Sequence, residues 1–206
     1  GWEKAAKGTL INRLILTLDP RGCVVHPVFA PNEEEALRPF LWRFWIKTPP
    51  KGKIAVFDRS WYRRVLVERV EKMVKKQEWR RAYEEITSFE RQLTDNGVVM
   101  IKFFLHISQK EQRKRFEKLQ KSSVTAWKVT KDDWRQHKQY ADYLVAIEDM
   151  LAQTDTDFAP WTIIESHDDR FATVKVFTTV VETIERKLQQ VKQHQKQLAT
   201  HAPKHS

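Results

Sequence analysis

The chain has 206 residues, of which 41% are hydrophobic and 31% charged, so it is long enough to bury one sizeable core. Its single cysteine, Cys23, excludes an internal disulfide, and no apolar run approaches the roughly 20 residues that a membrane-spanning helix needs. The 37 Lys and Arg residues outnumber the 27 Asp and Glu residues, and the formal charge of +10 predicts attraction to polyanions. We therefore expect a soluble, cytoplasmic protein with no membrane partner.

The chain opens with GWEKAAKGTL, which partly matches a phosphate-binding loop. Such loops read G-x-x-x-x-G-K-[ST], because the glycines let backbone N–H groups turn toward phosphate and the lysine reaches it. Gly1, Lys7 and Thr9 fit this pattern, whereas Ala6 stands at the second glycine and Gly8 separates the lysine from the hydroxyl. A phosphate loop normally follows a strand. No strand precedes Gly1 here, so we expect either that missing residues supply it or that the domain is altered at this end.

The rest of the chain alternates between helical periodicity and short apolar runs. In chain order the pattern predicts a helix over 10–18, a strand over 24–29, a helix over 33–45, a strand over 54–57, a helix over 70–95, a strand over 98–105, a helix after Ser108, a helix over 131–153, a strand over 162–165 and a helix from Asp169. Short strands separated by helices are typical of an α/β fold with a mainly parallel sheet. After Leu188 the chain is polar and basic, so we expect residues 191–206 to form a disordered tail.

A second candidate site lies in VFDRSWYRRVLVERV, residues 56–70, where a buried strand ends in Asp58 and Arg59. Ligands bind outside the carboxyl ends of parallel strands, so a carboxylate there can hold Mg²⁺ while the arginine faces phosphate. The alternative is that Asp58 is a plain helix N-cap. Further charges favour a functional cluster over a solvated helix face: Arg63, Arg64, Glu68 and Arg69.

Four blocks of the sequence resemble the polyphosphate kinase 2 family: GW-x(4)-KG, FDRSWY-x-R-x(2)-VERV, WK at 127–128, and T-x-T-x(2)-APW from Thr154 to Trp161. LDPRG together with RVLVERV is most similar to the polyphosphate:AMP phosphotransferase branch. The resemblance covers residues 1–188. It implies a P-loop kinase-like, three-layer α/β/α fold with a parallel sheet and a helical lid, in one domain over 1–190.

The resemblance also implies a reaction, in which phosphate moves from inorganic polyphosphate to AMP, or to ADP, with Mg²⁺. Lys7 matches the Walker A lysine, and Asp58 with Arg59 matches the Walker B pair, which makes these three the catalytic candidates. Asp58 and Glu3 are the metal candidates. The phosphate- and nucleotide-binding candidates are Glu3, Gly8, Thr9, Arg64, Glu68 and Arg69. Phosphoryl transfer depends mostly on positioning and charge neutralisation, and these residue types supply both.

The lid is expected over about 109–140, where basic residues can bind a chain of phosphates. The candidates there are Arg113, Arg115, Lys118 and Lys128, whereas Lys110, Lys114 and Lys121 are expected to solvate a helix. The chain departs from the family pattern at Lys4 and Ala6, and Leu119 stands where the family commonly has an arginine. Ser123 and Thr125 replace a usual proline and lysine.

Aromatic residues leave two alternatives open. Trp127 and Trp161 could stack on a base, but with eight tryptophans in the chain core packing is the expected use for most of them. The segment RPFLWRFW, residues 38–45, either forms an interface in a homo-oligomer, which we expect, or fills the core.

Three hypotheses follow from the sequence. The first is a polyphosphate-dependent nucleotide kinase. The second is a catalytically weak family domain that binds polyphosphate or a partner through its basic lid. The third is a nucleic-acid-binding protein, which ranks behind the others because no recognition motif of a nucleic-acid module is present.

Overall fold

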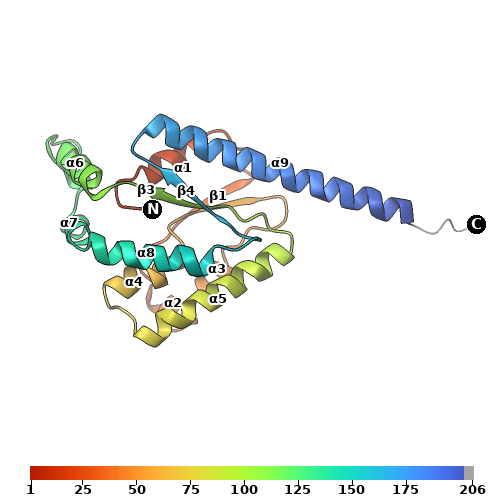
Figure 1. Cartoon of the computed structure of the whole chain (residues 1–206), viewed down its shortest axis with the longest axis horizontal. Helices are drawn as coiled ribbons and strands as arrows, with labels where there is room; N and C mark the ends of the chain where they lie inside the picture. The colour runs from red at the N-terminus through yellow and green to blue at the C-terminus, as the bar shows by residue number, and fades with distance from the viewer. Residues whose placement is uncertain (202–206) are drawn as a thin grey trace, which may run out of the picture.

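The computed structural model of the chain describes residues 1–201 (Figure 1). The first half contains α1 (Lys7–Ile15), β1 (Cys23–Pro27), α2 (Glu33–Ala36), α3 (Trp42–Trp45), β2 (Ile54–Asp58), the 3₁₀ helix η1 (Trp61–Val65), α4 (Val67–Val70) and α5 (Lys76–Asp95). The second half contains β3 (Lys102–His106), α6 (Gln109–Gln120), the 3₁₀ helix η2 (Ala126–Lys128), α7 (Lys131–Lys138), α8 (Tyr140–Thr154), β4 (Trp161–Glu165) and α9 (Asp169–His201).

All strand pairing in the described residues is parallel, as the alternation of strands and helices predicts. β1 pairs with β2 in the register Cys23↔Ile54 to Pro27↔Asp58, and β3 pairs with β4 from Lys102↔Trp161 onward. The expected single sheet is instead two pairs of strands in the part of the chain that the structure describes. The chain enters beside β3, because the backbone N–H of Trp2 donates to the carbonyl of Leu105 at 3.0 Å.

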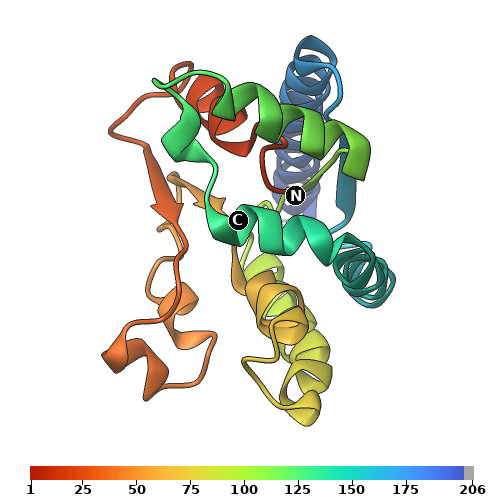
Figure 2. The same ribbon diagram turned by 90° about the vertical axis from the view of Figure 1, so that its left-hand side faces the viewer.

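Helices cover both sides of the strands, which gives the predicted three layers. Figure 1 shows α1 and α9 on one side and α5 and α8 on the other, with α9 extending well beyond the strands. α6 and α7 stand at one end of the molecule and face the viewer in Figure 2. The core between the layers is apolar and fully buried at Ile86, Phe89, Ile107, Met150 and Ile164, so the strand ends beside α6 and α7 are held on a rigid base.

Two helices predicted as continuous are broken. The predicted helix over 33–45 is two short helices, α2 and α3, because Pro39 between them cannot continue a helical hydrogen-bond ladder. The predicted helix over 131–153 divides at Gln139 into α7 and α8. Within the first of these regions Phe44 is buried, and Phe40 and Leu41 pack against the core, so this segment mostly fills the core.

Three other elements differ from their predicted bounds: α1 covers Lys7–Ile15 rather than 10–18, and α5 and β3 begin later than predicted. The predicted helix over 70–95 is interrupted at Lys72, whose φ is 54°, and α5 begins at Lys76. Its predicted end is confirmed: Asn96 is the C-cap and Gly97 has φ 88°. The backbone N–H of Val98 donates a hydrogen bond to the carbonyl of Leu93 at this helix end. The next strand starts at Lys102 rather than at residue 98.

The prediction of a disordered tail over 191–206 is wrong for residues 191–201, which continue α9. Glutamine, lysine and leucine are good helix formers, and that propensity outweighs their polarity here. Residues 202–206 lie outside the described residues. Among the residues that the structure describes, none of the helices is long and apolar enough to cross a membrane.

Candidate active site

The opening loop is anchored to β3 by its first two residues. Gly1 lies so close to Leu105 that an added Cβ would be 2.7 Å from the backbone nitrogen of Leu105, so only glycine fits. Trp2 stacks on Tyr140 with 4.0 Å between ring centroids and donates its indole N–H to Nδ1 of His106 at 3.3 Å. The loop therefore lies at the carboxyl end of β3, the edge at which ligands of parallel sheets bind.

The backbone of this loop turns through two left-handed residues, Lys4 with φ 59° and Ala6 with φ 68°. Ala6 is the N-cap of α1 and makes no side-chain cap, and Gly8 and Thr9 lie in the first turn of that helix. Left-handed turns aim successive N–H groups into one concavity, and a helix N-terminus adds partial positive charge. An arrangement of this kind can hold phosphate, and it forms here with alanine at position 6.

The ammonium of Lys7 points back across the loop. Its Nζ donates to the carbonyl oxygens of Gly1 at 3.0 Å and Trp2 at 2.9 Å, and lies 3.7 Å from Oε1 of Glu3. Burial lowers the pKa of Lys7, and the charge of Glu3 opposes that shift. A buried ammonium with few water contacts gains more from a phosphate than an exposed one does.

Asp58 is the last residue of β2, beside the loop. Its carbonyl accepts the N–H of Val28 at 3.0 Å, and its side-chain Oδ1 is buried without a hydrogen-bond partner in the described part of the chain. The N-cap position of the next helix, η1, is occupied by Ser60, so the alternative of a plain N-cap at Asp58 is wrong. A buried carboxylate oxygen without a partner is costly unless a cation or donor completes it.

Arg59 and Glu3 join the strand end to the loop. Arg59 has φ 62°, and its guanidinium donates to Oε1 of Glu3 at 2.8 Å. Burial opposes the ionisation of Glu3, but the charges of Lys7 and Arg59 lower the pKa of this carboxyl to about 2. Four predicted residues, Glu3, Lys7, Asp58 and Arg59, therefore meet in one charged cluster.

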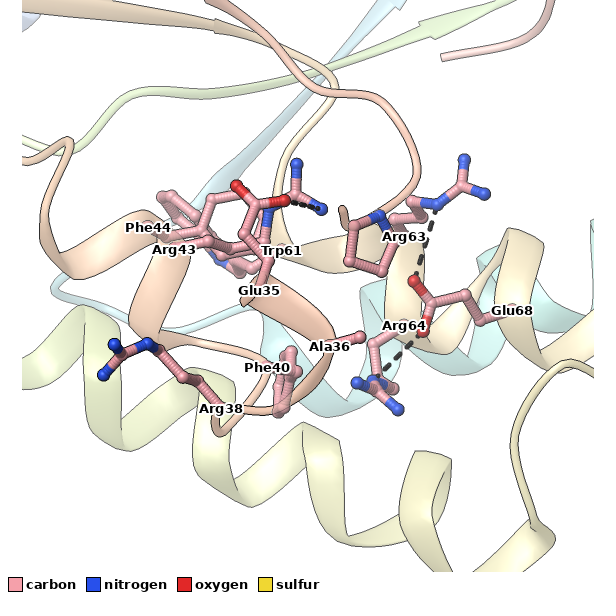
Figure 3. Close-up of a pocket in the computed structure, with 11 residues that line it drawn as sticks. Glu35, Ala36, Arg38, Phe40, Arg43, Phe44, Trp61, Arg63, Arg64 and Glu68 are labelled. Carbon is pink, nitrogen blue, oxygen red and sulfur yellow. Dashed lines mark ion pairs between the residues drawn. The ribbon is translucent and has the colours of Figure 1, made fainter. Parts of the chain in front are cut away.

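A shallow hollow of about 60 Å³ opens along η1, the 3₁₀ helix that follows Asp58 and Arg59 in the chain (Figure 3). Four arginines and two glutamates line it together with aromatic rings: Glu35, Arg38, Phe40, Arg43, Phe44, Trp61, Arg63, Arg64 and Glu68. Four positive charges against two negative ones leave the hollow cationic. Flat aromatic walls with a cationic rim suit a planar, anionic ligand.

Two predicted residues shape this hollow from η1 and α4. Glu68 places one carboxylate oxygen 3.4 Å from Nε of Arg63 and the other 3.2 Å from Nε of Arg64. The guanidinium of Arg64 also lies over the ring of Phe40, 4.6 Å from its centroid. Figure 3 shows both arginines reaching Glu68 through Nε, with the outer nitrogens of Arg63 directed away from the aromatic rings.

Arg69 does not line the hollow. Its guanidinium donates to the hydroxyl of Tyr83 at 2.8 Å, pairs with Asp149 at 2.7 Å and lies 4.2 Å from the ring of Trp79. These contacts fasten α4 to α5 and α8, so the geometry gives Arg69 a packing role.

The four predicted lid residues differ in their contacts. Arg113 is exposed and pairs with Glu117 at 2.8 Å, and Lys118 and Lys128 are also exposed. Arg115 is half-buried and donates to the carbonyls of Lys4 at 3.0 Å, of Ser166 at 2.5 Å and of His167 at 3.1 Å. Arg115 thus holds α6 to the loop, whereas the three exposed residues face solvent.

Sequence reasoning missed a second contact between loop and lid. Lys4, noted from the sequence only as a departure from the family pattern, places Nζ 3.1 Å from a carboxylate oxygen of Asp133 on α7. Asp133 is buried and also accepts the backbone N–H of Thr130. The two residues are 129 positions apart, so no local pattern relates them.

Sequence reasoning also missed Glu35, Arg38 and Arg43 in the hollow. The available signal was the pair of arginines inside the aromatic run RPFLWRFW, because charges within an apolar stretch need partners. Arg43 finds one in Glu35 at 3.3 Å. Of the two tryptophans considered for stacking, Trp161 packs inside the domain and Trp127 is 73% exposed.

The carboxylates do not form a closed metal cage. Within residues 1–201 no group of three or more His, Cys, Asp or Glu side chains is placed to hold a metal ion. The carboxylate of Glu3 is occupied by Arg59, and Asp58 alone offers a free buried oxygen in the cluster.

A left-handed loop at the end of a parallel strand, with a lysine opening the next helix and an Asp-Arg pair at the end of β2, is typical of the P-loop kinase-like class of α/β proteins. The profile of the polyphosphate kinase 2 family matches residues 1–193. The chain belongs to the polyphosphate kinase 2 family, as the sequence blocks indicated.

Curated and solved relatives agree with this assignment. The polyphosphate:AMP phosphotransferase of Pseudomonas syringae pv. tomato is 47% identical over 186 residues, which are 90% of this chain and 37% of that protein. A Pseudomonas aeruginosa PA01 crystal structure described as a polyphosphate kinase 2 is 43% identical with a TM-score of 0.89, covering 92% of this chain and 41% of that one. The polyphosphate kinase 2 structure from Arthrobacter aurescens TC1 is 30% identical with a TM-score of 0.87, covering 89% and 65%. The chain thus spans well under half the length of the first two relatives.

Proposed function

We propose that this chain transfers the terminal phosphate of inorganic polyphosphate to AMP and so forms ADP. The observation that carries the proposal is the meeting of Lys7, Asp58 and Arg59 in one charged cluster, followed along the chain by η1 and its cationic, aromatic hollow. The relative that is named a polyphosphate:AMP phosphotransferase supports the choice of substrates.

The two substrates are assigned to different parts of the site. Polyphosphate lies along the loop and the lid, where the N-terminus of α1, Lys7 and the exposed lid residues Arg113, Lys118 and Lys128 neutralise its charge. AMP lies in the hollow, with its phosphate on Arg63 and Arg64 and its base against the aromatic walls.

Mg²⁺ fits the cluster through Asp58. Magnesium in kinase sites is bound by one or two carboxylates plus substrate phosphates and water, so a closed cage is not required. The buried, unpartnered Oδ1 of Asp58 is the oxygen that would hold the ion. Glu3, which pairs with Arg59 in the same cluster, is the second carboxylate candidate. When bound, the ion neutralises negative charge on the transferring phosphate.

In the reaction an oxygen of the AMP phosphate attacks the terminal phosphorus of polyphosphate. A new P–O bond forms, the terminal P–O–P bond breaks, and the leaving oxygen stays on a polyphosphate shortened by one unit. Lys7 and Arg59 lie where the charge of the transferring group develops, and Arg63 and Arg64 orient the attacking phosphate. The lid over the loop excludes water and so disfavours hydrolysis of polyphosphate.

The test is ADP formation by purified protein given AMP, Mg²⁺ and long-chain polyphosphate. Asp58→Asn and Lys7→Ala are each expected to lower the rate by at least about a hundredfold, because each removes charge that acts on the transition state. Asp95→Asn and Lys76→Ala, at exposed positions of α5, are the matched controls and are expected to retain activity.

Two outcomes contradict the proposal in different ways. A folded protein that binds polyphosphate but forms no ADP supports the second hypothesis, a binding domain without turnover. ADP formation that survives both Asp58→Asn and Lys7→Ala shows that the reaction occurs elsewhere.

A further inference from the structure

A buried polar cluster lies under the hollow, outside the charged site. Glu90 of α5 is fully buried and Lys102 of β3 nearly so, and their side chains pair at 2.8 Å. The ammonium of Lys102 also donates to the hydroxyl of Tyr62 at 2.9 Å and to the carbonyl of Thr154 at 2.8 Å. All three of its N–H donors are therefore used inside the protein.

The other oxygen of Glu90 holds η1. Oε1 accepts the indole N–H of Trp61 at 2.9 Å and the hydroxyl of Tyr62 at 2.7 Å. Two successive residues of η1 are thus hydrogen-bonded to one carboxylate, which fixes the rotation of this short helix about its axis.

That rotation decides what faces the hollow. Trp61 lines it, with its ring in edge-to-face contact with that of Phe44 at 5.7 Å, and Arg63 and Arg64 follow on the same 3₁₀ helix (Figure 3). Because a 3₁₀ helix has about three residues per turn, turning Trp61 turns both arginines with it.

Packing alone does not call for charges at these two positions. Burying an ion pair costs several kcal/mol per ion in desolvation, and apolar residues of similar volume commonly stabilise a core as well or better. Apolar residues, however, could not accept the hydrogen bonds by which the indole N–H of Trp61 and the hydroxyl of Tyr62 both point at Glu90.

We propose that Glu90 and Lys102 are positioning residues: the buried pair orients η1 so that Trp61, Arg63 and Arg64 present a preformed site to the nucleotide monophosphate. This inference rests on the proposed function, in which AMP occupies the hollow. It predicts an effect on AMP rather than on polyphosphate, which the loop and lid bind.

The experiment replaces the pair by apolar residues in the double variant Glu90→Leu with Lys102→Met, which leaves no unpaired buried charge. Its melting temperature is expected to stay within about 5 °C of the parent. The KM for AMP is expected to rise at least about tenfold, because the arginines lose their orientation. The KM for polyphosphate is expected to change less than twofold. Glu85→Gln, a half-buried residue that pairs with Arg81 on the same helix, is the control.

Tyr62→Phe is the second variant, should the double variant fail to fold. It removes one hydroxyl from the cluster and no charge, and is expected to raise the KM for AMP about threefold with the KM for polyphosphate unchanged. An unchanged KM for AMP in a folded variant overturns the inference, and so does an equal rise in both KM values, which indicates a general loosening of the domain.

A readout without substrate separates this inference from the proposed function. The indole N–H proton resonance of Trp61, assigned with Trp61→Phe, reports its hydrogen bond to Glu90 directly. It is expected to move or broaden in both variants. If the parent forms no ADP, the proposed function is wrong; if the Trp61 resonance is unmoved, the positioning role is wrong whatever the activity.

Discussion

Ala6 carries backbone strain at the entrance to α1. Its φ of 68° lies in the left-handed region, which costs a residue with a Cβ roughly 1–2 kcal/mol. Ala6→Gly removes that cost, and the greater freedom of glycine in the unfolded chain cancels part of the gain. We expect the free energy of unfolding, measured by urea denaturation, to rise by about 0.5–1 kcal/mol.

Ala5→Gly is the matched control for this prediction. Ala5 is fully buried and is not among the residues with positive φ, so its loss removes a packed methyl group without relieving strain. It is expected to destabilise the protein. Equal loss of stability in both variants would show that position 6 carries no strain.

Glu3 makes the free energy of unfolding depend on pH. Its pKa in the folded protein is lowered from 4.5 to about 2. A carboxyl whose pKa is depressed on folding contributes stability above its unfolded pKa and loses it as the pH falls toward the folded pKa. The contribution is therefore complete above about pH 5, is lost between there and about pH 2, and is on the order of 3 kcal/mol.

Melting temperatures of the parent and Glu3→Gln, recorded from about pH 7 down to about pH 2.5, test this dependence. The parent is expected to be the more stable at neutral pH, and the difference is expected to shrink with acid. Glu182→Gln, at an exposed position of α9, is expected to show no such difference. A gap that stays constant through the acid range would contradict the assigned pKa.

At the scale of elements, two arginines on α6 have opposite roles. Arg113 is exposed beside Glu117, whereas Arg115 donates to the carbonyls of Lys4 and Ser166 and so fastens α6 to the loop. Removing Arg115 leaves those carbonyls without a charged donor, and each such hydrogen bond contributes about 1.5–3 kcal/mol. Removing Arg113 loses only a surface ion pair, which contributes little stability.

Arg115→Ala is therefore expected to lower the melting temperature by several degrees, and Arg113→Ala by less than about 2 °C. Polyphosphate affinity, measured by titration calorimetry, is expected to fall in Arg113→Ala although its stability is retained. If Arg115→Ala melts like the parent, α6 is not held to the loop in this way.

At the scale of the whole molecule, the net charge of +10 acts on any polyanion. Lysines and arginines that neutralise a polyanion release its counterions, so polyphosphate affinity is expected to fall at least about tenfold between about 50 and 200 mM salt. The affinity for AMP, which meets fewer charges in the hollow, is expected to fall less. Both are measurable by titration calorimetry at a series of salt concentrations.

Competition between DNA and polyphosphate for the same basic surface tests the third hypothesis, a nucleic-acid-binding protein. Single-stranded DNA of equal total charge is expected to displace polyphosphate only weakly, because the lid and loop follow a chain of phosphates without bases to read. DNA that competes as strongly as polyphosphate would favour a nucleic-acid-binding protein.

The parts that could be predicted from the sequence are those carried by neighbours in the chain. The strand that ends at Asp58, the lysine at the start of α1 and the helix end at Asn96 and Gly97 are all local patterns, and the structure has each of them. The helix breaks at Pro39 and Gln139 were harder, since apolar spacing continued across both. The helical tail to His201 was missed because polarity was given more weight than helix propensity.

The sequence by itself therefore determined the class of fold, because short strands alternate with helices, and the family, because the FDRSWY and APW blocks occur together; it also named the catalytic candidates. Only the tertiary structure decided what each charge does. Lys4 meets Asp133 across 129 positions, Arg69 packs helices rather than facing the hollow, and Glu90 with Lys102 lies beneath it. Such partners are chosen by burial, since a charge removed from water must find its counterpart wherever the chain has folded it.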